Sequence, residues 1–241
     1  MGVGDAIGEE SAKDLAFASL PNGVLVKPDS SIAPTDATII AEAEAIAQSA
    51  PIPPMVAYAT SVHGSLAAAY VFAYKRSGAG SISFTPISVG VSSTCVITNY
   101  FSGAESIVPE NALFSDTVTA AGSFYIVTPI GPSGIAVIGD LGKFASMGSK
   151  RIATLIDNGA TVDVTMAFAP GEAPVTLSGY AQSEPTVSAS NGSAALIAYN
   201  PATGQFQVSV TAGSQNAANI ALELSGSSAI RQPETEIRRL L

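Results

Sequence analysis

Acidic side chains near the start of the sequence have the types and spacing that acid–base chemistry needs. Asp5, Glu9 and Glu10 are followed by Lys27 and Asp29. Paired carboxylates cleave a glycosidic bond when one protonates the leaving oxygen and the other attacks or activates water. Neighbouring glutamates on a helix point in different directions, however, and acids are common in a first helical turn because they complement its dipole. The favoured interpretation is therefore structural: the acids form the start of a helix. The five residues are kept as candidates for binding a ligand.

A second polar group follows the apolar run 135–138. Asp140 and Lys143 come directly after this run, and Arg151 follows a few residues later. Such a group could bind a sugar or an ion, and Asp140, Lys143 and Arg151 are therefore also ligand-binding candidates. An ion pair within a turn explains the same residues and is the favoured interpretation. We assign no catalytic residue to either group.

The single histidine and the single cysteine give little support to metal or nucleophilic chemistry. His63 stands in a Ser-Val-His-Gly string that predicts an exposed turn, and it has no cysteine partners for a structural zinc site. Cys95 lies in an apolar run and is predicted to be a buried small hydrophobe rather than a nucleophile. We therefore expect no metal, no cofactor and no internal disulfide. Cysteine usage leaves the cellular compartment open.

Charge excludes two classes of partner. The net charge is −9 and the isoelectric point is about 4.4. Nucleic acids and anionic membrane surfaces both require clustered Lys and Arg, so neither is expected as a partner. No apolar run reaches the 18 or so residues of a spanning helix. The opening residues lack the basic and apolar regions of a secretory signal, so secretion is conceivable only with a signal from elsewhere.

The low charge density has two interpretations. Only 12% of residues are charged, about half of the roughly 25% that is usual for soluble domains. Either Ser, Thr, Asn and Gln solvate the surface, or part of the surface is buried against another molecule, including a second copy of the chain. The abundance of Ser and Thr favours the first interpretation.

Alternation of apolar and polar residues predicts the fold class. Residues 161–168, 205–210 and 220–224 each alternate with a period of two, and turn residues separate such runs. This pattern is typical of antiparallel strands with one buried face. We predict a mainly β protein, an antiparallel β-sandwich of jelly-roll type with a short helical N-terminal segment.

The chain divides into three parts by composition. Residues 1–54 are predicted to hold two helices, at 9–20 and from Thr35 or Asp36 to about 49, with prolines after the second. Residues 55–228 are predicted to form the sandwich, with hairpin turns at 63–64, 157–159 and 201–204. Residues 229–241 form a polar tail in which Arg238 and Arg239 precede two leucines, either a docking helix or a frayed end.

Aromatic residues offer a further interpretation as rings on which sugars stack. Alternation places three of them on one face of a single strand, and core packing is the favoured role for that face. The candidates are Tyr58, Tyr70, Phe72, Tyr74, Tyr100 and Phe101.

Short strings spread along the chain carry a resemblance to a known family. They are Gly-Asp at 4–5, Gly-Glu-Glu at 8–10, GVLVKPD at 23–29, YVFAY at 70–74, NYFSG at 99–103, PIGPSGI at 129–135, Gly-Asp at 139–140 and FAPGE at 168–172. In this order they resemble the C-terminal β-rich region of large α-galactosidase-like glycoside hydrolases. None of these strings is a catalytic signature.

The resemblance implies an accessory role. In that family a (β/α)₈ barrel carries the catalytic aspartates and an all-β domain follows it, so residues 1–50 would correspond to the end of the barrel or a connection. A barrel of about 250 residues has no room here, and Ser11 and Ala12 stand where the family has an aromatic residue. No catalytic residue is carried over.

Three functions follow as hypotheses. The favoured one is a non-catalytic accessory β-sandwich that packs against a catalytic domain or binds glycan weakly. The alternative is a structural or assembly subunit that forms a homo-oligomer through a low-charge β surface. A third is a stand-alone glycoside hydrolase that uses the acids Asp5, Glu9, Glu10 and Asp140.

Overall fold

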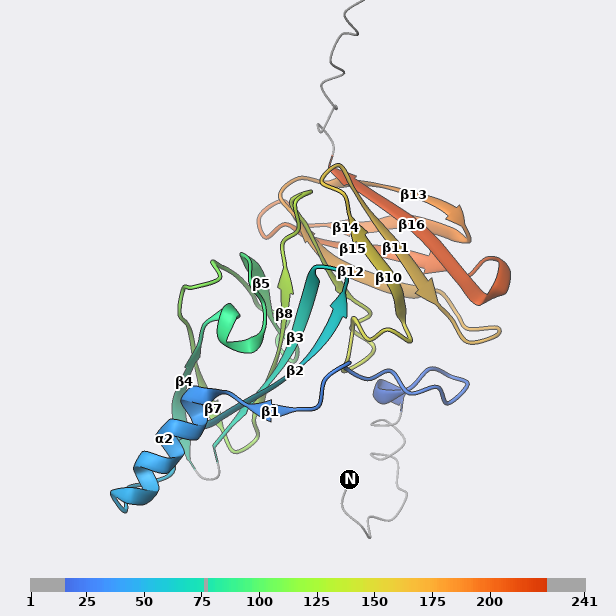
Figure 1. Ribbon diagram of the computed structural model, residues 1–241. Helices are drawn as coiled ribbons and strands as arrows, with labels where there is room; N and C mark the ends of the chain where they lie inside the picture. Colours follow the sequence, from blue (N-terminus) through green and yellow to red (C-terminus); the bar gives the residue numbers. More distant parts are fainter. Residues whose placement is uncertain (1–15, 76–77, 225–241) are drawn as a thin grey trace, which may run out of the picture.

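The computed structural model describes residues 16–75 and 78–224 and confirms a mainly antiparallel β protein (Figure 1). Every strand pair in this part of the chain is antiparallel. The strands form four sheets, two of which make a sandwich in the C-terminal half.

The sandwich consists of two four-stranded sheets. One has the order β10-β11-β16-β13 and the other β14-β15-β12-β9. The strands are β9 (Ile135–Gly139), β10 (Ile152–Asp157), β11 (Thr161–Ala167), β12 (Val175–Ala181), β13 (Pro185–Asn191), β14 (Ser193–Tyr199), β15 (Gln205–Thr211) and β16 (Ala217–Leu224).

The N-terminal half is built on a six-stranded sheet with the order β1-β2-β3-β8-β5-β6, beside the two-stranded sheet β4-β7. Its strands are β1 (Ala33–Pro34), β2 (Met55–His63), β3 (Leu66–Tyr74), β4 (Ala79–Phe84), β5 (Cys95–Asn99), β6 (Glu105–Val108), β7 (Phe114–Thr119) and β8 (Ser123–Pro129). A short 3₁₀ helix, Pro86–Val89, joins β4 to β5, and another, Ser214–Asn216, precedes β16.

The period-two pattern explains the sandwich strands. On β11, Val162, Val164 and Met166 are buried, whereas Asp163 between them is exposed. Val164 pairs with Ile220 of β16, which faces the same core. The predicted turn at 157–159 joins β10 to β11, and Gly159 adopts the positive φ of +86° that this turn needs.

The helix α2 (Asp36–Ala47) confirms the second predicted helix. Thr35 is its N-cap, because its hydroxyl oxygen accepts a hydrogen bond from the Thr38 N–H at 3.3 Å. The helix projects from the body at the lower left of Figure 1, and only Thr38 and Ala45 on it are buried. The first predicted helix, 9–20, lies mostly outside the described residues, of which 16–18 are helical.

Two hydrophobic clusters meet at the six-stranded sheet. On β3, Ala69, Val71 and Ala73 face a cluster that also contains residues of β4 and β7. The opposite face of the same strand places Ala68 and Tyr70 in the larger cluster that fills the sandwich. The N-terminal sheet therefore shares a core with the sandwich.

Candidate functional site

Three charged side chains form a buried group at one end of the sandwich, here called the Arg151 cluster: Asp140, Arg151 and Glu172. Asp140 follows β9, Arg151 precedes β10, and Glu172 lies between β11 and β12. The Arg151 side chain is fully buried, with its Nε 2.9 Å from Asp140 Oδ2. Its Nη2 donates to Glu172 Oε1 at 2.5 Å. One guanidinium therefore neutralises two carboxylates.

Backbone groups and one aromatic ring contact further atoms of the Arg151 cluster. Arg151 Nη1 donates to the Ala167 carbonyl at 2.7 Å, and the guanidinium lies 5.3 Å from the centre of the Phe168 ring. Glu172 Oε2 accepts from the Ala169 N–H at 2.7 Å. Asp140 Oδ1 accepts from the Gly142 N–H at 2.9 Å. These bonds hold the three connections in fixed positions, because a buried charge is stable only when paired and hydrogen-bonded.

Burial dominates the electrostatics of this site. It raises the pKa of Asp140, although the Arg151 charge works in the opposite direction. Burial also lowers the pKa of Lys143, and the Asp140 charge opposes that shift. Lys143 Nζ donates to the Ala16 carbonyl at 2.6 Å, which ties the loop after β9 to the N-terminal segment.

The Arg151 cluster forms the base of a polar hollow of about 440 Å³. Its other lining residues are Leu141, Gly142, Lys143, Pro174, Val175, Thr176, Ser178 and Gln207. The volume suits a small molecule, but no aromatic ring lines the hollow. Both carboxylates contact the same guanidinium, so each is already engaged in an ion pair.

A second hollow, here called the aromatic groove, runs along the face of β3 and β8. It has a volume of about 350 Å³. Its aromatic lining consists of Tyr70, Phe72, Phe124 and Phe144, and its remaining residues are Ala18, Val26, Lys27, Pro28, Ser30, Ile32, Ala59 and Ala145. Phe72 is 37% exposed and Phe144 36%, so parts of both rings face solvent.

The rings of the aromatic groove are held by their neighbours. Phe124 lies 6.4 Å from Tyr70 in a stacked arrangement and 6.3 Å from Phe144 edge to face, centre to centre. The Tyr70 hydroxyl accepts from the Met147 N–H at 3.0 Å and donates to Ser61 Oγ at 3.2 Å. Burial raises the pKa of Tyr70 to about 12. The groove is thus a preformed apolar surface.

The aromatic residues divide between core and surface. The core interpretation is confirmed for Tyr70, which is buried, whereas Phe72 on the same strand face is open to solvent. Phe101 is 69% exposed and lies outside the lining of the groove.

The predicted N-terminal candidates do not form one site in the described part of the chain. Asp5, Glu9 and Glu10 lie outside the described residues. Lys27 lines the aromatic groove. Asp29 binds the backbone of β2, because its Oδ2 accepts a hydrogen bond from the Val62 N–H at 2.8 Å. The structure places Asp140, Lys143 and Arg151 around one polar hollow. Asp140 and Arg151 are ion-paired there, as the sequence favoured, whereas Lys143 donates to the Ala16 carbonyl.

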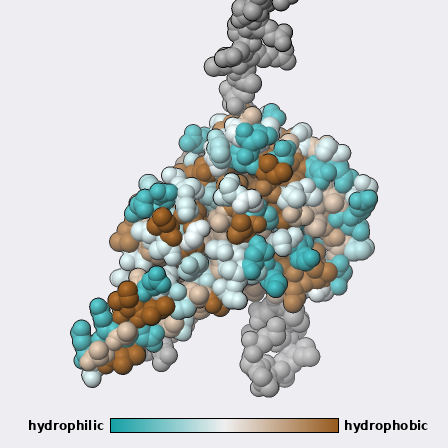
Figure 2. Space-filling model, in the orientation of Figure 1, coloured by the Kyte–Doolittle hydropathy of each residue, from teal (hydrophilic) through white to brown (hydrophobic). Residues whose placement is uncertain are grey.

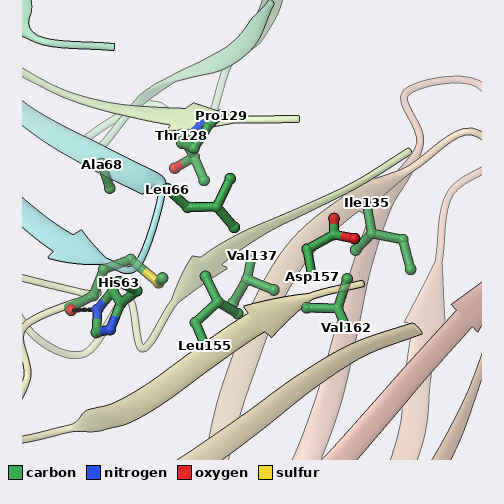
Figure 3. Close-up of a pocket in the computed structure, with 11 residues that line it drawn as sticks. His63, Leu66, Ala68, Thr128, Pro129, Ile135, Val137, Leu155, Asp157 and Val162 are labelled. Carbon is green, nitrogen blue, oxygen red and sulfur yellow. Dashed lines mark hydrogen bonds between the residues drawn. The ribbon is translucent and has the colours of Figure 1, made fainter. Parts of the chain in front are cut away.

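The prediction of an exposed histidine is wrong. His63 is only 7% exposed, and its Nε2 lies 2.7 Å from the Met147 carbonyl oxygen. Figure 3 shows this contact beside a narrow gap between the N-terminal sheet and the sandwich. The gap holds about 10 Å³, room for one water molecule at most. Cys95 is fully buried, as predicted.

Sequence reasoning missed Glu172 as a member of the site. Its string FAPGE was noted only for resemblance, and the residue lies 21 positions from Arg151. The available signal was indirect: an arginine buried between strands requires carboxylates around it, but nothing in Lys150-Arg151 indicates burial.

Metal and membrane features can be stated for the described ranges. No group of three or more His, Cys, Asp or Glu that could hold a metal occurs within residues 16–75 and 78–224. None of the helices described there has the length and apolar character that crossing a membrane requires.

No protein-family model matches the sequence, and no curated protein matches it.

Proposed function

We propose that this protein is a non-catalytic accessory module of a carbohydrate-active system and binds glycan weakly in the aromatic groove. The observation that carries the proposal is the pair of partly exposed rings, Phe72 and Phe144, in a groove of about 350 Å³. The resemblance of the sequence to the trailing β region of α-galactosidase-like glycoside hydrolases supports carbohydrate as the ligand class.

The chemistry of the groove suits one or two sugar rings. The C–H face of a sugar is apolar and stacks on an aromatic ring, which supplies a large rigid contact area. Polar groups at the rim can bind hydroxyls: the exposed Lys27 carries an ammonium donor, and Ser30 carries a hydroxyl. Ser30 Oγ already accepts from the Thr60 N–H at 2.8 Å, which fixes its position.

Weak binding follows from the composition of the groove. Few polar groups converge on it, and affinity depends on such anchors more than on buried area. The carboxylates that the structure describes in the polar hollow are both paired with Arg151, which supports a binding role over a catalytic one.

The test is a titration of the purified protein with mono- and oligosaccharides, including α-galactosides, followed by NMR or calorimetry. We expect saturable binding that Phe72→Ala or Phe144→Ala weakens at least about fivefold, since stacking contacts are worth roughly 1 kcal/mol. Phe101→Ala is the matched control, because this more exposed ring lies outside the groove lining and its loss should leave affinity unchanged.

Two results would contradict the proposal. One is the absence of saturable binding to any sugar by a protein whose fold is intact. The other is turnover of an α-galactoside that Asp140→Asn abolishes while the urea midpoint is maintained.

A further inference from the structure

The solvent-facing side of α2 is apolar, the reverse of the usual arrangement. Ile39, Ala43 and Ile46 follow the i, i+4, i+7 spacing of one helix face, and Ile40 and Ala47 lie beside them. Ile39 is 51% exposed, Ile40 58% and Ile46 64%. Figure 2 shows this helix as a projecting arm with brown, hydrophobic residues on its surface.

A helix at the surface of a monomer normally turns its apolar stripe toward the core. On α2 the inward side carries Thr38 and Ala45, and the Thr38 hydroxyl bonds to the Val56 backbone at 3.1 Å. The isoleucines therefore add nothing to the described core. Contiguous exposed apolar residues of this kind mark an interaction surface.

The charges around this face restrict its partner. The charged residues of α2 are Asp36, Glu42 and Glu44, all acidic. A symmetric pair of these helices would bring three carboxylates from each copy together with no basic residue from either helix. The complementary occupant is a segment that is both apolar and basic.

The sequence contains one such segment beyond β16. Residues 225–241 hold three of the ten basic residues of the chain, Arg231, Arg238 and Arg239, and two acidic residues, Glu234 and Glu236. The side chains of this segment therefore sum to +1, against −9 for the whole chain, and the two adjacent arginines directly precede the two leucines. Ile237, Leu240 and Leu241 have i, i+3, i+4 spacing, so a helical turn would place them on one face. In Figure 1 β16 reaches the top of the molecule, whereas α2 projects at the bottom, which favours docking onto another copy.

We propose that residues 225–241 of one copy dock on the apolar face of α2 of a second copy. Ile237 and the two leucines would cover Ile39 and Ile46, while the arginines face Glu42 and Glu44. The contact is head-to-tail, and repetition of such a contact closes a ring or extends a chain of subunits. The inference is independent of glycan binding in the aromatic groove.

The test uses sedimentation and light scattering on the full chain across a concentration series. The acceptor variant is Ile39→Ser with Ile46→Ser, and the donor variant is Arg238→Glu with Arg239→Glu. Each should raise the dissociation constant of self-association by at least about tenfold. The matched control is Ile197→Ser on β14, where the isoleucine is 55% exposed and lies away from α2.

Mixing the two variants gives the decisive result. The acceptor variant keeps an intact tail and the donor variant keeps an intact helix face, so the mixture should form a one-to-one dimer that neither variant forms alone. The proposal is overturned if the unaltered protein stays monomeric at all concentrations. It is also overturned if the acceptor variant dissociates an oligomer that the donor variant leaves intact, which would indicate direct pairing of the helices.

Discussion

Replacing Arg151 with methionine should be among the most destabilising changes in this protein. The guanidinium is fully buried, forms ion pairs with Asp140 and Glu172, donates to the Ala167 carbonyl, and lies against the Phe168 ring. Methionine fills much of the same space without the charge. The Asp140 and Glu172 side chains are only 7% and 8% exposed, so both would remain as buried carboxylates without a counterion. Breaking such a pair costs about 3–5 kcal/mol.

The loss in Arg151→Met should depend on pH in a defined direction. Burial already raises the pKa of Asp140, and without the opposing Arg151 charge this folded-state pKa rises further. A group whose pKa is raised on folding favours the folded state below the unfolded pKa and disfavours it as pH rises through the folded pKa. The loss in free energy of unfolding caused by Arg151→Met is therefore largest near neutral pH, and it becomes smaller as the pH falls toward about 4.

The assay is urea denaturation at several pH values, with free energies of unfolding from the midpoint and slope. The matched control combines Arg151→Met with Asp140→Asn and Glu172→Gln, which removes the unpaired charges and should recover at least half of the loss. A loss below about 1 kcal/mol in Arg151→Met, or a triple variant no more stable than the single one, would refute the assignment of these ion pairs as a buried network.

Three further changes test other parts of the fold. Gly139→Ala should cost at least about 2 kcal/mol in urea, because φ is +95° and a Cβ would overlap the Ser146 carbonyl oxygen. Burial raises the pKa of Cys95 to about 12, so iodoacetamide at pH 8 should label it only after unfolding; rapid labelling of folded protein would contradict this. Tyr70→Phe should lower the free energy of unfolding by about 1–2 kcal/mol, because it leaves the Met147 N–H without its acceptor. Folding raises the pKa of Tyr70 to about 12, so the unaltered protein loses stability as the pH rises from about 10, and its difference from the Phe variant should become smaller.

The strands of the sandwich could be predicted because the information for them is local. Alternation on β11 and β16 and the turn at 157–159 are readable within a few residues. The division into four sheets was not readable, because alternation shows which face of a strand is buried but not its partner. β3, for example, pairs with β8 across a segment that contains four other strands.

The Arg151 cluster could be predicted only in part for the same reason. Asp140 and Arg151 flank one loop, so their ion pair could be expected from sequence, whereas Glu172 comes from a different connection. His63 was misjudged because its turn is tight and polar, as in exposed hairpins. The loop after β9 covers it, and no local pattern indicates that contact.

The loop between β9 and β10 explains how the charged cluster relates to the proposed binding surface. Its ends are Asp140 and Arg151, which ion-pair across its base. Its middle supplies Phe144 to the aromatic groove and the Met147 backbone to Tyr70, the innermost groove ring. The Arg151 cluster is therefore better understood as the support of the groove than as a site of chemistry. The buried charges of the Arg151 cluster would be costly without their partners, and their pairing holds the loop that completes the aromatic groove. This role explains why the carboxylates in the polar hollow are already ion-paired.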